Sequence, residues 1–115
     1  MMKLAVYGTL RKGSGNLCRI EKTALIYPGH QRFPAMIHDA AGSGTVVEVQ
    51  EVDNEALTAY DRYEGVDAGI YQRVKADVVM DDGSRTAAWV YLAGEKLLEQ
   101  RESFFAINSG DWFNR

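Results

Sequence analysis

The sequence is poor in cysteine, with Cys18 alone, and contains only two prolines in 115 residues. A single cysteine excludes an intrachain disulfide and suits a reducing compartment. No apolar run approaches the roughly 20 residues of a membrane-spanning helix. The three apolar residues after Lys3 are too few for the roughly 7–15-residue core of a signal peptide. We therefore expect a cytoplasmic protein with no membrane partner.

Basic charge is also in short supply, which bears on the partners the chain could bind. The formal net charge is −3, the pI is about 5.3, and the cations are scattered rather than clustered. Nucleic-acid binding needs a basic face, so no nucleic-acid partner is expected. The histidines, His30 and His38, lie eight residues apart without clustered Cys or Asp partners, so no metal site is expected. Cys18 is interpreted as a small buried residue of a short helix rather than a nucleophile.

The remaining composition, 46% hydrophobic and 25% charged, is typical of one folded domain over residues 1–115. Short apolar or alternating runs separated by Gly, Pro, Asn or Asp predict β-strands. The segment 81–84, Asp-Asp-Gly-Ser, predicts a tight hairpin between the last two of them. The predicted strands cover residues 3–7, 23–27, 35–38, 45–52, 71–80 and 85–92.

The clearest helix follows the strand at 45–52. Asp53 or Asn54 can cap its first turn, apolar residues recur from position 56 to 63 at spacings of three and four, and Gly65 is suited to end it. A brief helix over 17–22, capped by Asn16, is also expected, and residues 95–107 could form a helix or a loop followed by a helix. With five or six strands joined by short links, the expected class is α+β. The expected architecture is a small, mixed but mostly antiparallel β-barrel flanked by one or two helices.

Polar, glycine-rich sequence directly after the first strand is the first candidate for a site. The segment 6–16, VYGTLRKGSGN, contains Gly8, Gly13 and Gly15, and it lacks both the Gly-Lys-Ser/Thr ending and the G-x-G-x-x-G spacing of nucleotide-binding loops. Glycine allows a ligand to approach backbone N–H groups at the end of a sheet. A plain glycine-rich connection explains the segment equally well from these residues alone.

Glu64 and Tyr71 are two further candidates. Glu64 closes the main helix, where unpaired carbonyls and neighbouring tyrosines would raise its carboxyl pKa, as a general acid/base near neutral pH requires. Tyr71 begins a strand and carries a neutral hydroxyl suited to orienting a polar ligand. Each is also readily explained as an ordinary structural residue, a surface glutamate at a helix end and a strand aromatic.

Taken together, these segments resemble the γ-glutamyl cyclotransferase-like family, in particular its γ-glutamylamine cyclotransferase branch. VYGTLRKGSGN is similar to the family's N-terminal motif, and EVDNEALTAYDRYEG to its strand-to-helix segment ending in an acidic residue before glycine. YQR at 71–73 resembles the strand that follows, and SGDW at 109–112 the C-terminal motif of small bacterial members. The likeness extends over nearly the whole chain.

The resemblance implies a small β-barrel flanked by helices that releases 5-oxoproline from a small γ-glutamyl compound without metal or cofactor. It places Tyr7, Gly8, Thr9 and Leu10 in the substrate-binding loop. It also implies that Glu64 is the acid/base and that the Tyr71 hydroxyl contacts substrate. The substrate's own α-amine would be the nucleophile, which agrees with the lack of an evident Ser or Cys nucleophile.

Three alternatives remain open at this point. A domain of the same fold could bind a small metabolite without turning it over, although a binder has no need of a proton carrier such as Glu64. A different enzyme on this scaffold could release a γ-glutamyl protecting group. A plain interaction domain would need an exposed apolar patch, which no stretch of the sequence obviously supplies.

Overall fold

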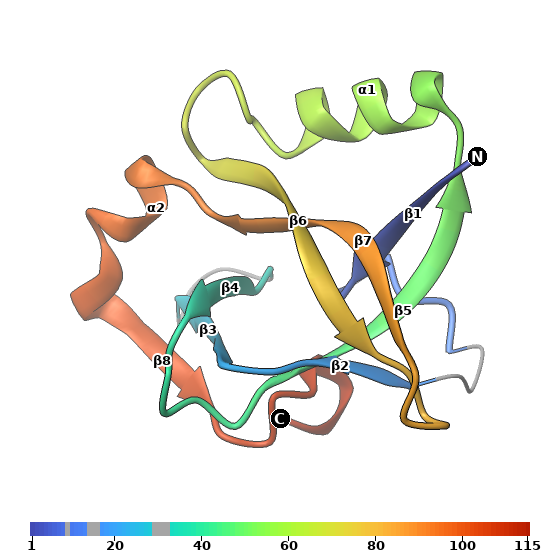
Figure 1. Cartoon of the computed structure of the whole chain (residues 1–115). Helices are drawn as coiled ribbons and strands as arrows, with labels where there is room; N and C mark the ends of the chain where they lie inside the picture. Colours follow the sequence, from blue (N-terminus) through green and yellow to red (C-terminus); the bar gives the residue numbers. More distant parts are fainter. Residues whose placement is uncertain (9, 14–16, 29–32) are drawn as a thin grey trace.

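Five strands close into a barrel in the computed structural model, which describes residues 1–8, 10–13, 17–28 and 33–115 (Figure 1). Around the barrel each strand pairs with the next in the order β1–β5–β2–β6–β7, and β7 pairs with β1 to complete it. Most of these pairs are antiparallel; the contact between β1 and β7 is parallel. The barrel strands are β1 (Met2–Val6), β2 (Cys18–Ile20), β5 (Thr45–Val52), β6 (Tyr71–Val79) and β7 (Arg85–Ala93).

A three-stranded extension continues the sheet from β7. Its order is β4–β3–β8, and it joins the barrel where Met36 pairs with Leu92. The extension strands are β3 (Thr23–Pro28), β4 (Ala35–His38) and β8 (Phe104–Ile107). The predicted α+β class and the mostly antiparallel barrel are therefore confirmed, with more strands than expected.

The main helix, α1 (Asn54–Tyr63), begins and ends where the sequence predicts. The Asp53 carboxylate accepts a hydrogen bond from the Ala56 N–H at 2.8 Å, which satisfies one of the unpaired donors of the first turn. Gly65 has φ +66°, the left-handed conformation of a helix-ending glycine. The other helical segments are α2 (Glu95–Leu98) and the 3₁₀ turns η1 (Arg101–Ser103) and η2 (Trp112–Asn114). Within the described ranges, no helix is long and apolar enough to span a bilayer.

The predicted helix over 17–22 is wrong, because this stretch contains strand β2. Arg19 pairs with Val46 of β5 on one side and with Val79 of β6 on the other, so β2 fills a position in the barrel wall. A three-residue strand is too short to show a period in the sequence. The expected capping residue, Asn16, lies outside the described residues, and Cys18 is buried as expected but within a strand.

The expectation for residues 95–107 is also corrected. Only Glu95–Leu98 is α-helical, and Phe104–Ile107 forms strand β8, antiparallel to β3. This strand is the outer edge of the extension, so pairing with β3, rather than any local pattern, defines it.

Two apolar clusters occupy opposite faces of the sheet. The first takes residues from all five barrel strands and fills the barrel interior, with Val90 and Leu92 contributed by β7. The second lies on the other face and includes Tyr91 and Ala93 of the same strand, packed with Leu57 of α1. Because side chains alternate along a strand, the two faces of β7 belong to two different environments.

Candidate active site

Glu64 lies directly after α1, as its C-terminal capping residue. Its N–H donates to the Tyr60 carbonyl at 2.8 Å, so its backbone continues the last helical turn. The side chain is half-buried, and this burial raises the pKa of the carboxyl group above its ordinary value. The predicted direction of the pKa shift is therefore confirmed, with removal from water as its cause.

Three tyrosines from three strand ends interact electrostatically with this carboxyl group. They are Tyr7 after β1, Tyr71 at the start of β6, and Tyr91 near the end of β7. Burial raises the pKa of all three phenols, and the negative charge of Glu64 raises each of them further. All three are almost completely buried. The fold thus brings Glu64, Tyr7 and Tyr71 into one neighbourhood from separate parts of the sequence.

The hydroxyl groups of Tyr7 and Tyr71 hold the surrounding backbone. Tyr7 donates to the Tyr91 carbonyl at 2.6 Å and accepts from the Met36 N–H at 3.2 Å. Tyr71 donates to the Pro34 carbonyl at 2.6 Å. Both phenol hydrogens are therefore used within the protein, and the Tyr71 oxygen retains its capacity to accept a further hydrogen bond.

Gly8 packs against the same Pro34. A Cβ atom at Gly8 would lie 3.1 Å from both Cγ and Cδ of Pro34, closer than ordinary van der Waals contact. Its φ is not among the positive values that other glycines adopt, so lack of space, rather than backbone conformation, explains the glycine. Tyr71, Pro34 and Gly8 therefore form one continuous set of contacts.

Backbone donors of the loop divide into two groups. The N–H groups of Lys12 and Gly13 donate to the Glu48 carboxylate at 2.7 and 3.0 Å. Among the described residues, those of Gly8 and Leu10 have no hydrogen-bond acceptor, while the Leu10 carbonyl accepts from Gln50 Nε2 at 3.0 Å. Thr9, the remaining predicted loop residue, lies outside the described residues. Within the described ranges, these are the two N–H groups of the predicted loop that have no acceptor.

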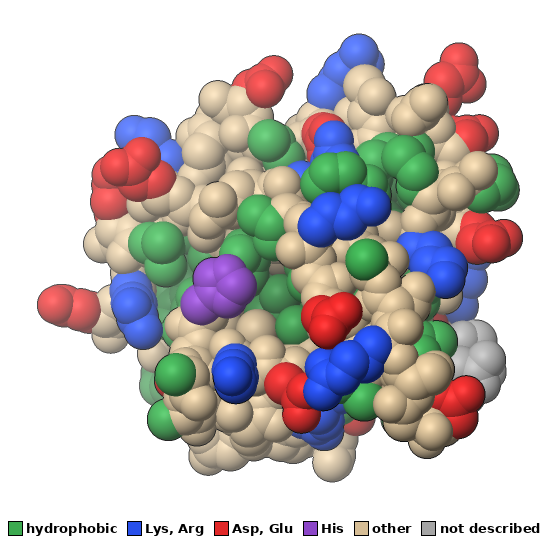
Figure 2. All heavy atoms as spheres, in the orientation of Figure 1, with side chains coloured by type: hydrophobic (Ala, Val, Ile, Leu, Met, Phe, Trp, Pro, Cys, Tyr) green, Lys and Arg blue, Asp and Glu red, His purple; other side chains and the backbone are tan. Residues whose placement is uncertain are grey.

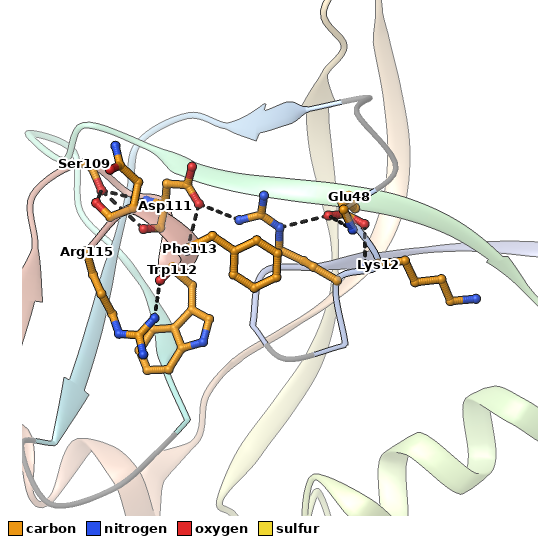
Figure 3. A network of polar contacts seen from close by, with 10 residues as sticks. Lys12, Glu48, Ser109, Asp111, Trp112, Phe113 and Arg115 are labelled. Atoms are coloured by element: carbon orange, nitrogen blue, oxygen red, sulfur yellow. Dashed lines mark hydrogen bonds and ion pairs between the residues drawn. The ribbon is translucent and has the colours of Figure 1, made fainter.

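Glu48 and Arg11 are residues that the sequence reasoning missed. Arg11 Nε donates to Glu48 Oε2 at 3.1 Å, and its Nη1 donates to Asp111 Oδ1 at 2.6 Å (Figure 3). The Phe113 ring centroid lies 4.1 Å from the Arg11 guanidinium carbon. This network joins the glycine loop, strand β5 and the C-terminal SGDW segment.

The Glu48 carboxyl group is ionised within this network. Burial opposes its ionisation, but the hydrogen bonds from Lys12, Arg11 and Gly13 outweigh burial and hold its pKa below the ordinary value. A buried carboxylate with three donors fixes the path of the loop after Leu10.

A second network anchors α1 to the barrel one turn before Glu64. Arg73 of β6 donates to both oxygens of Asp61 at 2.8 and 3.1 Å, and the Tyr91 hydroxyl donates to Asp61 Oδ1 at 2.7 Å. Burial opposes ionisation of Asp61, but these donors lower its pKa overall. The end of α1, and hence Glu64, is held by a charged fork to β6.

Of the two histidines, the structure describes only His38. His38 is exposed at the end of β4, and His30 lies outside the described residues. In the part of the chain that the structure describes, no group of three or more His, Cys, Asp or Glu side chains could hold a metal ion.

A family model and a related protein each match most of this chain. The family model described as "Gamma-glutamyl cyclotransferase, AIG2-like" matches residues 4–114. A protein of Methanocaldococcus jannaschii named "Putative gamma-glutamylcyclotransferase MJ1514" is 31% identical over 100 residues, which cover 78% of this chain and 82% of the relative.

Solved structures show the same fold. An AIG2-like protein from mouse superposes with a TM-score of 0.69 at 24% identity, covering 81% of this chain and 77% of that protein. An uncharacterized protein from Pyrococcus horikoshii gives a TM-score of 0.60 at 26% identity, covering 97% and 90% of the two chains.

Proposed function

The chain belongs to the AIG2-like gamma-glutamyl cyclotransferase family, and on that basis we propose that it releases 5-oxoproline and a free amine from a γ-glutamyl compound. The observation that carries this proposal is the half-buried Glu64 carboxyl group with a raised pKa, placed among Tyr7, Tyr71 and Tyr91. A proton carrier in such surroundings is useful to an enzyme and of no use to a passive binder.

The proposed reaction needs only one acid/base group. Glu64 takes a proton from the substrate's α-ammonium group, and the freed amine attacks the γ-carbonyl carbon. The new C–N bond closes a five-membered ring, and the carbonyl oxygen carries negative charge in the tetrahedral intermediate. The bond to the leaving nitrogen then breaks while Glu64 returns its proton to that nitrogen, and Glu64 next carries the second proton of the ring nitrogen to the released amine, which departs as an ammonium ion. The products are 5-oxoproline and a free amine.

In this proposal the loop binds the γ-glutamyl substrate and orients it. The N–H groups of Gly8 and Leu10, which have no acceptor among the described residues, are donors suited to a carboxylate or to the developing oxyanion. In this proposal the Tyr71 oxygen accepts a hydrogen bond from the substrate, while the Tyr71 hydroxyl continues to donate to the Pro34 carbonyl. Holding the flexible γ-glutamyl chain in its ring-closing geometry is the entropic part of the catalysis.

The leaving amine is proposed to be that of a γ-glutamylamine. This choice follows the likeness of VYGTLRKGSGN to that branch of the family. The fold and the family match are common to enzymes acting on several γ-glutamyl compounds, so the choice needs a direct assay.

The decisive assay incubates the purified protein with a panel of γ-glutamyl compounds, including γ-glutamyl amino acids, the γ-glutamyl derivative of the lysine ε-amine and γ-glutamyl polyamines. We expect release of 5-oxoproline in equal amount to the free amine, fastest with a γ-glutamylamine. Binding of a panel member, measured by calorimetry, without any 5-oxoproline would instead identify the chain as a metabolite-binding domain of the same fold.

A further inference from the structure

A cleft of about 410 Å³ opens on the side of the barrel where β2 and β6 diverge. Its walls are residues 74–77 of β6 and residues 20–23 at the junction of β2 and β3, and Met36, Val90 and Leu92 contribute to its apolar surface. Figure 1 shows β6 and β2 meeting only at one end, and Figure 2 shows apolar side chains at the centre of this face with charged side chains around them. The volume suits a short segment of chain or a small molecule.

This cleft and the tyrosines Tyr71 and Tyr91 lie on opposite faces of the sheet. Val90 and Leu92 belong to the cluster inside the barrel, whereas Tyr91 belongs to the cluster on the opposite face of β7. Tyr71 likewise belongs to that second cluster, while Val74 packs against the first. A ligand in the cleft would therefore contact the opposite face of the sheet from Tyr71 and Tyr91, whereas Tyr7 belongs to the cluster inside the barrel and its hydroxyl accepts from the N–H of the cleft residue Met36.

One wall of the cleft is a strand edge with few partners. β6 pairs with β7 along its whole length, from Tyr71 opposite Ala93 to Val79 opposite Arg85. On its other side, among the described residues, β6 pairs with a strand only where Val79 meets Arg19. Most of this edge is therefore free to pair with an added strand.

The hydrogen-bond pattern identifies the backbone groups on this edge. The Met80 N–H donates to the Ser84 carbonyl at 2.8 Å, which fixes the even-numbered residues of β6 as those bonded to β7. The alternate residues Arg73, Lys75 and Asp77 consequently direct their N–H and C=O groups toward the cleft side. An extended chain can satisfy both kinds of group, whereas a lone anion satisfies only the donors.

The charged residues along the β6 edge determine which side chains an added strand should carry. Lys75 lies 4.9 Å from the Trp89 ring centroid and, within the described residues, has no acidic partner. The two acidic residues of the cleft wall, Glu21 and Asp77, are both paired with Arg85, at 2.8 and 3.4 Å. An acidic residue opposite Lys75 would complete a cross-strand ion pair. Its two neighbours would point to the other face of the added strand, into the apolar cleft.

We propose that this cleft is a docking site for an extended segment of a partner protein, with alternating acidic and apolar residues, which adds to β6 as a further strand. The backbone of β6 supplies the hydrogen bonds, the apolar surface of Met36, Val90 and Leu92 receives the apolar side chains, and Lys75 selects an acidic residue.

The test uses a capped pentapeptide of alternating valine and glutamate as the probe. Titration monitored by amide NMR should shift the Lys75 and Asp77 N–H resonances and protect both from exchange. A peptide with lysine in place of glutamate should bind about fivefold more weakly, the scale of a cross-strand charge pair. A backbone N-methylated version of the glutamate peptide should lose about tenfold for each hydrogen bond removed. Equal binding of all three peptides, or shifts confined to other residues, would overturn the proposal.

Variants at one position separate backbone from charge. Lys75→Pro removes one N–H that faces the cleft, together with the lysine charge, and spares the ladder to β7, so it should weaken binding of the glutamate peptide about tenfold beyond the loss seen with Lys75→Gln while unfolding stays cooperative. Lys75→Glu should reverse the preference toward the lysine peptide, and Lys75→Gln should remove the preference. None of the charge variants should change 5-oxoproline release.

The same variants also detect a different occupant of the cleft, a second copy of this chain. Sedimentation of the protein alone should give a concentration-independent mass. A dimer that Lys75→Pro dissociates would overturn the proposal and assign the edge to a second copy of this chain. If Lys75→Pro fails to fold, the N-methylated peptide tests the same hydrogen bonds from the ligand side, and its unimpaired binding would contradict the proposal.

Discussion

Arg11 and Glu48 form an ion pair, with Nε and Oε2 3.1 Å apart, in which both side chains are 3% exposed or less. The pair lies where the loop after β1, the middle of β5 and the C-terminal segment meet, and Asp111 completes it (Figure 3). Both charges are removed from water, so each depends on its partner and on the loop N–H groups for its stability. The conformation of the predicted substrate loop therefore depends on the buried charge of Glu48.

Replacing this buried carboxylate should weaken both the fold and the loop. Glu48→Gln leaves Arg11 with one acidic partner and should lower the free energy of unfolding by about 3 kcal/mol, the usual scale for breaking a buried pair. KM for the γ-glutamyl substrate should rise, because the loop loses its anchor. Urea unfolding and steady-state kinetics measure the two effects. Glu51→Gln, at an exposed position of the same strand, is the control and should change neither.

The lowered pKa of Glu48 predicts how stability depends on pH. A carboxyl group whose pKa is lower in the folded state stabilises the fold above its unfolded-state pKa, about 4.3. That contribution is lost as the pH falls through the lower folded-state pKa. The difference in unfolding free energy between wild type and Glu48→Gln should therefore be largest at neutral pH and shrink in acid. A difference independent of pH would show that the charge of Glu48 is not what stabilises the loop.

Gly8→Ala tests the close approach of the loop to Pro34. The added Cβ would press on the proline ring, and we expect a loss of about 1 kcal/mol in stability from overpacking. The displaced loop should cost roughly ten- to a hundredfold in kcat/KM. Gly83→Ala is a matched control, because Gly83 has φ +87° in open space at the hairpin tip. It should lose stability from backbone strain without any change in kcat/KM.

Asp61 is expected to act as a positioning residue for Glu64. Asp61→Asn removes the charge that Arg73 grips with two hydrogen bonds, so the end of α1 should shift and kcat should fall by about tenfold or more. The acid limb of the pH–rate profile should persist, since Glu64 still titrates. Arg73→Lys, which cannot form the two-pronged contact, should give a smaller loss in the same direction. Reduced thermal stability with an unchanged kcat would leave Asp61 with a purely structural role.

The parts of the fold that were predictable have local signals. The start and end of α1 follow from Asp53 and Gly65, and the β6–β7 hairpin follows from alternation and the turn sequence before Arg85. Strand β2 was missed because three residues are too few to show a period, and strand β8 was missed because its residues were included in an expected helical segment over 95–107. Their structure depends on the neighbours they pair with, and no pattern within them reports it.

The site, like the fold, has one part that the sequence predicts and one part that it does not. The expected raised pKa of Glu64 could be argued from its place at a helix end beside tyrosines, and the structure agrees with its direction. The Arg11–Glu48–Asp111 network joins residues far apart in the sequence. A glutamate within an apolar strand indicates that a partner exists, but only the folded chain identifies Arg11 as that partner.

Glu64 is proposed to carry the proton during cyclisation, and its replacement by glutamine separates proton transfer from substrate binding. Glu64→Gln keeps the size of the side chain and its hydrogen bonding but cannot transfer a proton, so a γ-glutamyl substrate should bind within a few-fold of wild type. Turnover to 5-oxoproline should fall by roughly a hundredfold or more, the usual scale of general acid–base catalysis. In the wild type the rate should rise with pH through an apparent pKa above about 4.3, the ordinary value for glutamate, because the carboxyl group must be ionised to accept the first proton and burial raises its pKa. Glu55→Gln, at an exposed position in the first turn of the same helix, should behave as wild type. A Glu64→Gln protein that cyclises γ-glutamyl amines at the wild-type rate would show that the Glu64 carboxyl group does not carry the proton.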